Sequence, residues 1–178
     1  MPRPVLVVVD VQERLFAAMD ADRREEMVAN IKILCAAARR LDVPRLVTEQ
    51  YPKGLGHTLP EVRALLEDVD PIVKTEFSCC GADGFVERLQ HLDAGPVILA
   101  GLEAHVCVLL TATELLKRAF PVTIVADAVC SRRAEKLEVG LAQARQAGAV
   151  ITTTETLVFQ LLGRADTDAF RELAKLLR

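Results

Sequence analysis

Short apolar runs alternate along the chain with longer segments in which apolar residues recur every three or four positions. The short runs are rich in β-branched residues and predict buried strands at residues 4–9, 45–48, 71–73, 97–100, 122–126 and 149–152. The longer segments predict helices at residues 23–41, 59–66, 105–116, 134–147, 153–162 and 167–177. Strands and helices that alternate without repeats or linkers are typical of an α/β protein with a doubly wound, largely parallel sheet.

Local signals mark two of the helix ends. Gly148 follows the helix over residues 134–147, at a position where a glycine commonly ends a helix. Thr152 and Glu155 have the spacing of a capping box, which predicts that Thr152 caps the helix continuing to Leu162.

The composition supports one domain and argues against a polyanionic partner. The chain has 178 residues, 51% of them hydrophobic, which suffices for the core of a single domain over residues 1–178. The net charge is -3, the pI is near 5.7, and basic residues are scattered. We therefore expect a small neutral or cationic ligand, and neither nucleic acid nor a membrane as partner. The apolar run at the start is too short for a signal peptide, which favours a cytoplasmic protein.

The cysteines have no spacing typical of a disulfide framework or a structural metal site, and we interpret them as reduced thiols. Cys35 lies on the predicted core-facing stripe of its helix and is interpreted as a packing residue. Cys79 and Cys80 are adjacent, and a disulfide between neighbours is strained, so two packing thiols are favoured. The remaining thiols are Cys107 and Cys130.

Three chemically capable residues stand at or near predicted strand ends. Asp10 and Lys74 each follow a strand directly, and Cys107 lies in the first turn of the helix that follows residues 97–100. The carboxyl ends of parallel strands meet at one edge of a sheet, and right-handed crossovers bring these residues to it. The start of a helix lowers a thiol pKa and stabilises an oxyanion, so Cys107 is a candidate nucleophile.

Each of these residues also has an ordinary interpretation. Asp10 fits a loop hydrogen bond, Lys74 a solvated side chain, and Cys107 a small buried hydrophobe. A phosphotransfer site is disfavoured because the second residue after Asp10 is Gln12 rather than aspartate. A nucleotide-binding domain is disfavoured because residues 10–16 contain no glycine.

Two predicted loops, residues 49–57 and 75–83, supply candidate walls of a pocket. His57 has only Glu49 and Tyr51 as neighbouring donors in its loop, fewer than a metal requires, so we expect no metal. The side chains that we expect to contact substrate are Gln12, Tyr51, His57 and Phe77.

The set of Asp10 in VVVDVQ, Lys74 in VKTEFS and Cys107 in GLEAHVCV resembles the catalytic triad of the isochorismatase-like cysteine hydrolases. That superfamily includes nicotinamidases and carbamoylsarcosine amidohydrolase. The resemblance covers nearly the whole chain and extends to EQYPKGLGHT at residues 49–58 and TLVFQLLG at residues 156–163. Each motif is short, but their combination is specific.

The resemblance implies a three-layer α/β/α fold with six parallel strands and a non-proline cis peptide at Leu102-Glu103. It also implies an oxyanion hole made by the backbone N–H groups of Glu103 and Cys107. In the implied mechanism Asp10 takes the proton of Cys107, the thiolate attacks an amide carbon, and water hydrolyses the resulting thioester. Lys74 supports both anions.

One departure from the family pattern bears on metal binding. Nicotinamidases bind a metal through an Asp-x-His and a later histidine, whereas this chain has Glu49, Gln50 and Tyr51, with His57 following. We therefore expect neither a metal nor another cofactor, and nicotinamide is not implied as the substrate.

The function predicted on these grounds is hydrolysis of a C–N bond in a small amide. The alternatives are an isochorismatase-type ether hydrolase and a catalytically quiet binding or assembly protein with the same fold. The apolar helix after Cys107 predicts a homo-oligomer, and the resemblance to this superfamily implies the same. We also expect Cys107 to hold more thiolate at neutral pH than an unperturbed thiol, provided that Lys74 outweighs Asp10.

Overall fold

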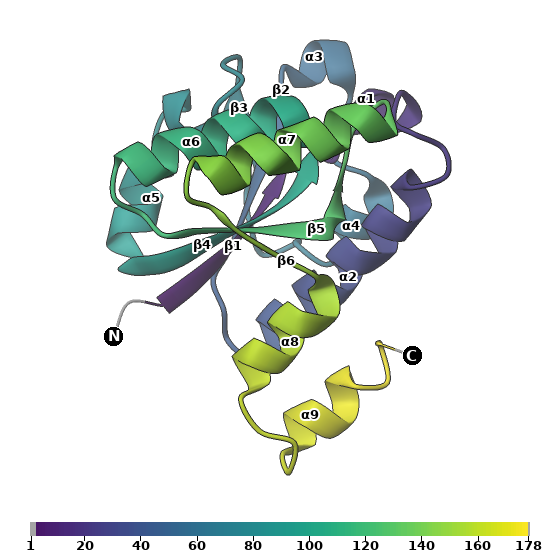
Figure 1. Ribbon diagram of the computed structural model, residues 1–178, viewed down its shortest axis with the longest axis vertical. Coiled ribbons are helices and arrows are strands. Elements are labelled where there is room, and N and C mark those ends of the chain that lie inside the picture. Colours follow the sequence, from purple (N-terminus) through teal and green to yellow (C-terminus); the bar gives the residue numbers. More distant parts are fainter. Residues whose placement is uncertain (1–2, 178) are drawn as a thin grey trace.

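The computed structural model describes residues 3–177 and contains a six-stranded sheet of order β3-β2-β1-β4-β5-β6 (Figure 1). Every neighbouring pair of strands is parallel. The six-stranded parallel sheet predicted from the sequence is therefore confirmed. The strands are β1 (Arg3–Val9), β2 (Arg45–Gln50), β3 (Ile72–Lys74), β4 (Ala94–Leu102), β5 (Val122–Cys130) and β6 (Val150–Thr152).

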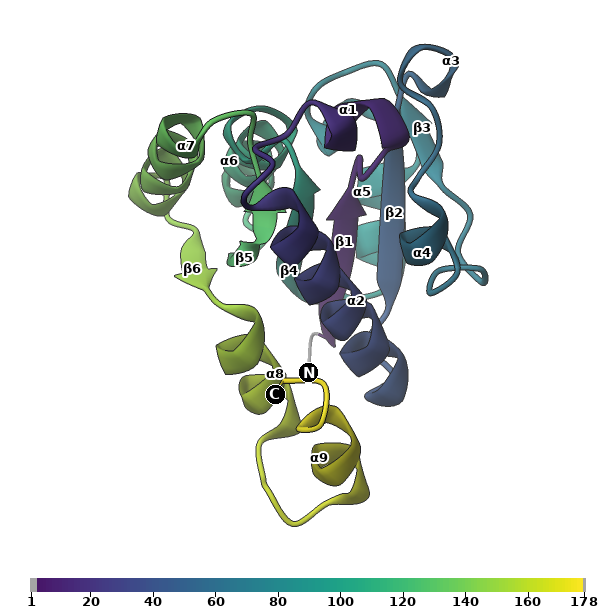
Figure 2. The same cartoon turned by 90° about the vertical axis from the view of Figure 1, so that its right-hand side faces the viewer.

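Helices cover both faces of the sheet, with α5, α6 and α7 on one face and α2 and α8 on the other, and α9 packs against α2 and α8 (Figure 2). The α-helices are α1 (Glu13–Ala17), α2 (Arg24–Arg40), α3 (Pro52–Leu55), α4 (Pro60–Arg63), α5 (Phe85–His91), α6 (Leu109–Lys117), α7 (Ala134–Gln146), α8 (Thr154–Leu162) and α9 (Asp168–Leu173). Two shorter turns are η1 (Cys79–Gly81), a 3₁₀ turn, and η2 (Ala104–Val108), a π-helical turn. Among residues 3–177, no helix has the length and apolar character needed to cross a membrane.

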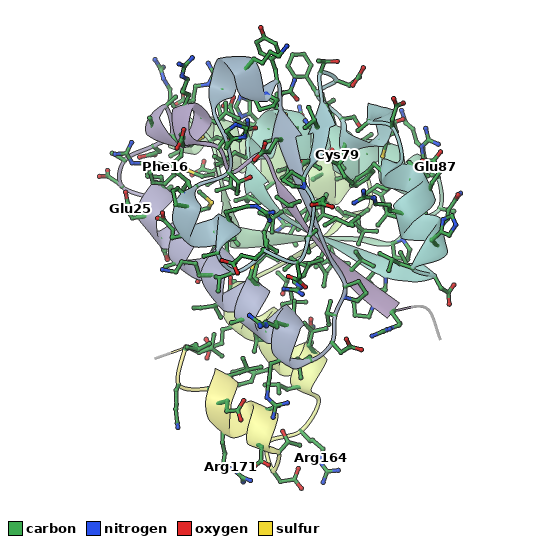
Figure 3. All side chains as sticks on the ribbon, turned by 180° about the vertical axis from the view of Figure 1, so that it is seen from behind. Phe16, Glu25, Cys79, Glu87, Arg164 and Arg171 are labelled. Carbon is green, nitrogen blue, oxygen red and sulfur yellow. The ribbon has the colours of Figure 1, made fainter. Side chains whose placement is uncertain are left out.

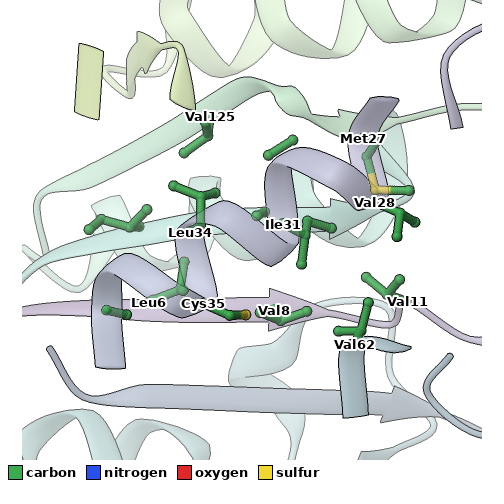
Figure 4. Close-up of a cluster of buried hydrophobic side chains, with 14 of the residues drawn as sticks. Leu6, Val8, Val11, Met27, Val28, Ile31, Leu34, Cys35, Val62 and Val125 are labelled. Carbon is green, nitrogen blue, oxygen red and sulfur yellow. The ribbon is translucent and has the colours of Figure 1, made fainter. Parts of the chain in front are cut away.

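The sheet separates two hydrophobic cores because successive side chains of β1 point to opposite faces. Leu6 and Val8 face α2, where they meet Ile31 and Leu34 (Figure 4). Cys35 also belongs to this cluster, which confirms its interpretation as a packing residue, and burial raises its pKa to about 12. Each fully buried leucine or isoleucine in such a layer stabilises the fold by about 1.5–3 kcal/mol.

The strand order changes direction between β1 and β4, and ligands bind beyond the carboxyl ends of strands at such a point. The two strands approach closely there because Gly101, at φ +117°, has no side chain. A Cβ at this position would lie 2.1 Å from the Val9 carbonyl oxygen. The glycine therefore lets the ends of β1 and β4 meet at the edge where Asp10 follows.

Several predicted boundaries differ from the structure. The cap of α8 is Thr153, whose hydroxyl accepts a hydrogen bond from the Thr156 N–H, and Thr152 is still part of β6. The predicted capping box is thus wrong by one residue. The Gly148 prediction is confirmed, because α7 ends two residues earlier and Gly148 has φ +109°.

Other differences concern short helices. The predicted helix over residues 59–66 has only one α-helical turn, α4, and continues in tight turns to Leu66. The last predicted helix, residues 167–177, ends at Leu173 as α9. The sequence pattern did not predict α1, α3 or α5, because segments of four to seven residues give too few periods to recognise.

Candidate active site

Asp10 lies directly beyond β1 with φ +49°, a left-handed conformation in which aspartate is more tolerated than most residues. Its N–H donates to the Thr48 carbonyl oxygen at 3.1 Å. Its carboxylate accepts one hydrogen bond on each oxygen: the Thr48 hydroxyl donates to Oδ1 and the Lys74 ammonium to Oδ2, both at 2.7 Å. Asp10 is completely buried, so these partners replace the water that the carboxylate loses.

Lys74 is the last residue of β3, in register with Gln50 of β2. Besides Asp10, its ammonium donates to Gln50 Oε1 at 2.6 Å and to the carbonyl oxygens of Glu76 and Phe77 at 3.1 and 3.2 Å. Three N–H groups thus serve four acceptors, and no proton is left over for a ligand. Burial by itself lowers the pKa of Lys74, but the Asp10 carboxylate raises it overall.

Cys107 is the fourth residue of the π-helical turn η2, which continues directly into α6. The Glu103 carbonyl oxygen accepts from both Val106 and Val108, so the turn is wider than the α-helical start expected from the sequence. Cys107 is almost entirely buried, and the charges of Asp10 and Lys74 both act on the pKa of its thiol. The structure therefore brings Asp10, Lys74 and Cys107 together at the carboxyl edge of the sheet.

The electrostatic environment of Cys107 differs from the expectation. Burial and the Asp10 carboxylate raise the pKa of the Cys107 thiol from 9.0 to about 12, although Lys74 opposes them. The expectation of an enlarged thiolate fraction in the resting protein is therefore wrong. Lys74 does not outweigh the other two effects because its ammonium is already paired with the Asp10 carboxylate. The order in which the five cysteines react stays a prediction.

The other two cysteines near the site are free and buried, as their interpretation as packing thiols predicts. Cys79 is the first residue of the η1 turn, in the upper part of the molecule in Figure 3. Its Sγ is 3.7 Å from the Thr48 hydroxyl, and its N–H donates to the Thr111 hydroxyl at 2.9 Å. Burial raises the pKa of Cys79 to about 12 and that of Cys80 to about 11.

Gln12 ties the loop over residues 51–58 to the sheet. Its side-chain amide donates to the carbonyl oxygens of Gln50 and Gly56, at 2.9 and 2.6 Å, and its Oε1 accepts from the Gln50 N–H. Gln12 has no exposed surface. Backbone groups thus use both N–H donors of the Gln12 amide, and the side chain holds the loop in place.

Glu49 anchors the far end of the same loop. Its Oε1 accepts from the N–H and the hydroxyl of Thr58, each at 2.8 Å, and its Oε2 lies 3.1 Å from His57 Nδ1. Burial raises the pKa of Glu49, but the hydrogen bonds from Thr58 and His57 lower it overall. The His57 side chain is 78% exposed beyond this anchor.

The backbones of Tyr51 and Phe77 contact Lys74, and the rings of both residues are exposed. The Tyr51 N–H donates to the Lys74 carbonyl oxygen, and the Phe77 carbonyl oxygen accepts from the Lys74 ammonium. Their exposed fractions are 53% and 60%, unusually large for aromatic residues. Both rings are therefore available to a ligand or another chain.

Glu103 directly precedes the η2 turn, and the peptide bond between Leu102 and Glu103 is cis. Its carboxylate forms a two-point ion pair with Arg132, both N–O distances being 2.9 Å. His105 Nδ1 lies 2.9 Å from the buried Ser131 hydroxyl. Burial lowers the pKa of His105, and the charges of Lys136 and Arg132 act in the same direction.

The residues at the position of the family's metal site do not fit a metal ion. Both oxygens of Glu49 are engaged by Thr58 and His57, and Tyr51 is exposed. Within residues 3–177, His, Cys, Asp and Glu side chains form no group of three that could bind a metal. The donor set therefore offers at most one free nitrogen, that of His57.

Sequence reasoning missed Thr48 and Gln50, the two β2 residues that hold Asp10 and Lys74. The predicted strand ended at Thr48, but β2 continues to Gln50 at the same edge. The sequence does show a run of polar residues after the apolar strand. It does not show which residues they bind, because Asp10 and Lys74 belong to other parts of the sheet.

A cavity of about 580 Å³ lies at the opposite end of β2, lined by residues that include Arg45, Arg88 and His91. It is far from the carboxyl edge and contains no thiol or hydroxyl nucleophile among its lining residues. The chemistry is at the other edge of the sheet, so we do not assign the candidate site to this cavity.

Comparison with known proteins identifies the family of this chain. The model of the isochorismatase domain family matches residues 4–156. The chain therefore belongs to the isochorismatase-like superfamily, as the motifs predicted.

Individual relatives are similar over nearly the full length. Isochorismatase domain-containing protein 2 of Danio rerio is 40% identical over 174 residues, covering 97% of this chain and 86% of the relative. The structure of MAR1 ribonuclease from Caenorhabditis elegans has 40% identity and a TM-score of 0.91, covering 98% of this chain and 89% of that one. YcaC of Escherichia coli, described as an octameric hydrolase of unknown specificity, has 23% identity and a TM-score of 0.90, covering 98% and 86%. At that identity YcaC supports the fold alone.

Proposed function

We propose that this protein is a cysteine hydrolase that cleaves the C–N bond of a small amide, with Cys107 as nucleophile, Asp10 as proton acceptor and Lys74 as their support. One observation carries the proposal: a completely buried ion pair of Asp10 and Lys74 stands against the Cys107 thiol at the ligand-binding edge. Burying an ion pair costs free energy, and a protein that only binds a ligand has no need for this arrangement. Groups with strongly shifted pKa values are more typical of catalytic sites.

The raised pKa of Cys107 determines the order of events. The thiol is protonated at rest, so attack requires transfer of its proton to Asp10 as the sulfur bonds to the amide carbon. Backbone N–H groups of Glu103 and Cys107 stabilise the oxyanion. The amine leaves with the proton from Asp10, and a thioester forms on Cys107. Asp10 then takes a proton from water, whose oxygen attacks the thioester and releases the acid and the thiol.

Lys74 acts here as a fixed counter-charge. Its N–H groups are all engaged by Asp10, Gln50 and the two loop carbonyls, so it does not donate a proton to the leaving group. The exposed rings of Tyr51 and Phe77, with His57, supply substrate contacts, whereas the buried Gln12 supports the loop. The catalytic unit is a single domain over residues 1–178 that needs neither metal nor other cofactor.

Assembly and location belong to the same proposal. The exposed aromatic rings beside Lys74 favour a homo-oligomer. The absence of a basic run favours a small molecule over nucleic acid, although the C. elegans relative is named a ribonuclease. We assign the protein to the cytoplasm, with an isochorismatase-type ether hydrolase or a quiet binding protein as alternatives.

Ammonia release from a panel of small primary amides tests the proposal. Cys107→Ala and Asp10→Asn should each abolish turnover, whereas Cys130→Ala, which changes a buried thiol outside the site, should retain it. Added hydroxylamine should divert the acyl group to a hydroxamate, because thioesters react with strong nucleophiles. Chelator should leave turnover unchanged.

Other outcomes would contradict the proposal. Turnover that survives Cys107→Ala would exclude a thioester. Cleavage of a labelled RNA that depends on Cys107, in a protein inactive on every amide, would replace the amide by a nucleic acid.

A further inference from the structure

Thr48 holds Asp10 at two points. Its carbonyl oxygen accepts from the Asp10 N–H at 3.1 Å, and its hydroxyl donates to Asp10 Oδ1 at 2.7 Å. The pairing of β1 with β2 puts Thr48 opposite Val9, directly beside the residue where the chain turns into its left-handed conformation. Both Thr48 and Asp10 are completely buried, so water cannot substitute for either bond.

The direction of these hydrogen bonds follows from the chemistry. An ionised carboxylate only accepts, so the single proton of the Thr48 hydroxyl points to Asp10. The contact with Cys79 Sγ at 3.7 Å must then use the Cys79 proton. The Thr48 hydroxyl is thereby satisfied as donor and as acceptor, and it cannot rotate away from Asp10 without losing both partners.

We propose that Thr48 is a positioning residue, which fixes the Asp10 carboxylate toward Cys107 and restrains its affinity for the thiol proton. This inference rests on the proposed function and deepens it. With Thr48 on Oδ1 and Lys74 on Oδ2, the carboxylate cannot turn about its bond to the β-carbon, and the proton from Cys107 must arrive at an oxygen that already accepts one hydrogen bond. Loss of the Thr48 hydroxyl makes the carboxylate a stronger and less oriented base.

The groups that titrate around Asp10 are few. Lys74 comes from β3, Cys107 from η2, and Cys79 from η1. In the proposed mechanism the proton of the Cys107 thiol passes to the Asp10 carboxylate as the sulfur attacks. A change in the affinity of Asp10 for that proton must therefore appear in the reactivity of Cys107, even before a substrate is known.

Alkylation of Cys107 by iodoacetamide, followed from pH 4 to pH 9 by peptide mass spectrometry, tests this proposal. Hydrogen bonds to a charged group correspond to about one to two pKa units, so Thr48→Val should move the acid limb of the profile upward by about that amount. The rate at which Cys107 is alkylated at pH 7 should rise by about tenfold or more in Thr48→Val, because the thiol proton then resides more often on Asp10. Thr48→Ser keeps the hydroxyl and should restore the wild-type profile.

Thr111→Val is the matched control. Thr111 is equally buried and bonds to the same Cys79, but it does not contact Asp10, so its profile should keep the wild-type midpoint. Circular dichroism checks that each variant folds. If Thr48→Val does not fold, Thr48→Ala takes its place, because it removes the same hydroxyl without putting a methyl group in its position.

Asp10→Asn separates this proposal from the proposed function. It should remove the inflection of the acid limb, because a thiol without a proton acceptor reacts about tenfold more slowly for each unit that the pH falls below its pKa. An unchanged inflection would mean that Cys107 does not pass its proton to Asp10, which contradicts the proposed mechanism. If Asp10→Asn removes the inflection but the hydroxyl-free Thr48 variant leaves its pH unmoved, or if Thr111→Val moves it equally, the role assigned to Thr48 is overturned.

Discussion

Replacement of Lys74 by methionine probes the central ion pair through stability, without any substrate. Methionine has a similar length and no charge. The side chains of Lys74 and Asp10 are both 0% exposed and their N–O distance is 2.7 Å, so Lys74→Met leaves a buried carboxylate with Thr48 as its remaining donor. It also removes the donor of Gln50 Oε1 and of two loop carbonyls.

The expected magnitude follows from this loss of compensation. Breaking a buried ion pair by removing one partner costs about 3–5 kcal/mol, because the other charge stays buried. Asp10→Asn should cost a similar amount, and asparagine is the right replacement because it tolerates the φ of +49°. The double variant buries no unpaired charge, so its cost should fall below the sum of the two by about 2–3 kcal/mol.

Urea unfolding followed by circular dichroism measures these differences. With a slope of about 2 kcal/mol/M, Lys74→Met should lower the midpoint by about 1.5–2.5 M. All variants are compared at one protein concentration, since association would add its own stabilisation. The deficit of Lys74→Met should grow from pH 5 to pH 8, because the unpaired carboxylate is costly only while ionised, and the double variant should not show this growth.

Two results would refute the reasoning. A cost of less than about 1 kcal/mol for Lys74→Met would mean that the carboxylate finds water or another donor, and that the pair is not isolated from solvent. Full additivity in the double variant would mean that Lys74 and Asp10 act independently of each other.

Two further predictions concern stability. Burial raises the pKa of Cys35, Cys79 and Cys107 to about 12, so the unfolded chain loses these protons near pH 9 while the folded chain keeps them. The unfolding free energy measured in urea should therefore fall above pH 9 by about 1.4 kcal/mol per pH unit for each thiol, less steeply in Cys35→Ala, and a flat profile to pH 10.5 would contradict the burial. Gly140→Ala should destabilise by about 1–3 kcal/mol despite its better helix propensity, because the added Cβ would lie 2.8 Å from His105 Cα. The exposed Gln143→Ala on the same helix is its control, and a Gly140→Ala protein as stable as wild type in the same urea assay would show that α7 does not press on the turn that carries Cys107.

The sequence by itself determined the sheet and the three residues at its edge. Apolar runs such as residues 4–9 and 97–100 are local patterns, and a strand buried on both faces needs nothing else to be recognised. The carboxyl ends of parallel strands joined by right-handed crossovers lie at one edge of the sheet. Asp10 and Lys74 each come directly after a predicted strand, so the sequence places both at that edge. Cys107 follows from the helix after β4, and the family motif added its role as a resemblance.

Only the tertiary structure decided the partners and the protonation of these residues. Thr48 and Gln50 hold Asp10 and Lys74 from a neighbouring strand, and their register depends on pairing that local sequence does not encode. The same holds for Gln12, which was expected to meet substrate and is enclosed by backbone groups from two other segments.

The thiol of Cys107 gives the physical reason for this division. A helix start and a nearby lysine, both visible in sequence, predict a lowered pKa, yet burial and the adjacent carboxylate raise it to about 12. Burial is a sum over neighbours from distant parts of the chain, and the balance between Asp10 and Lys74 depends on distances of a few ångströms. A local pattern therefore specifies which groups reach the edge, and only the packed fold specifies where their protons lie.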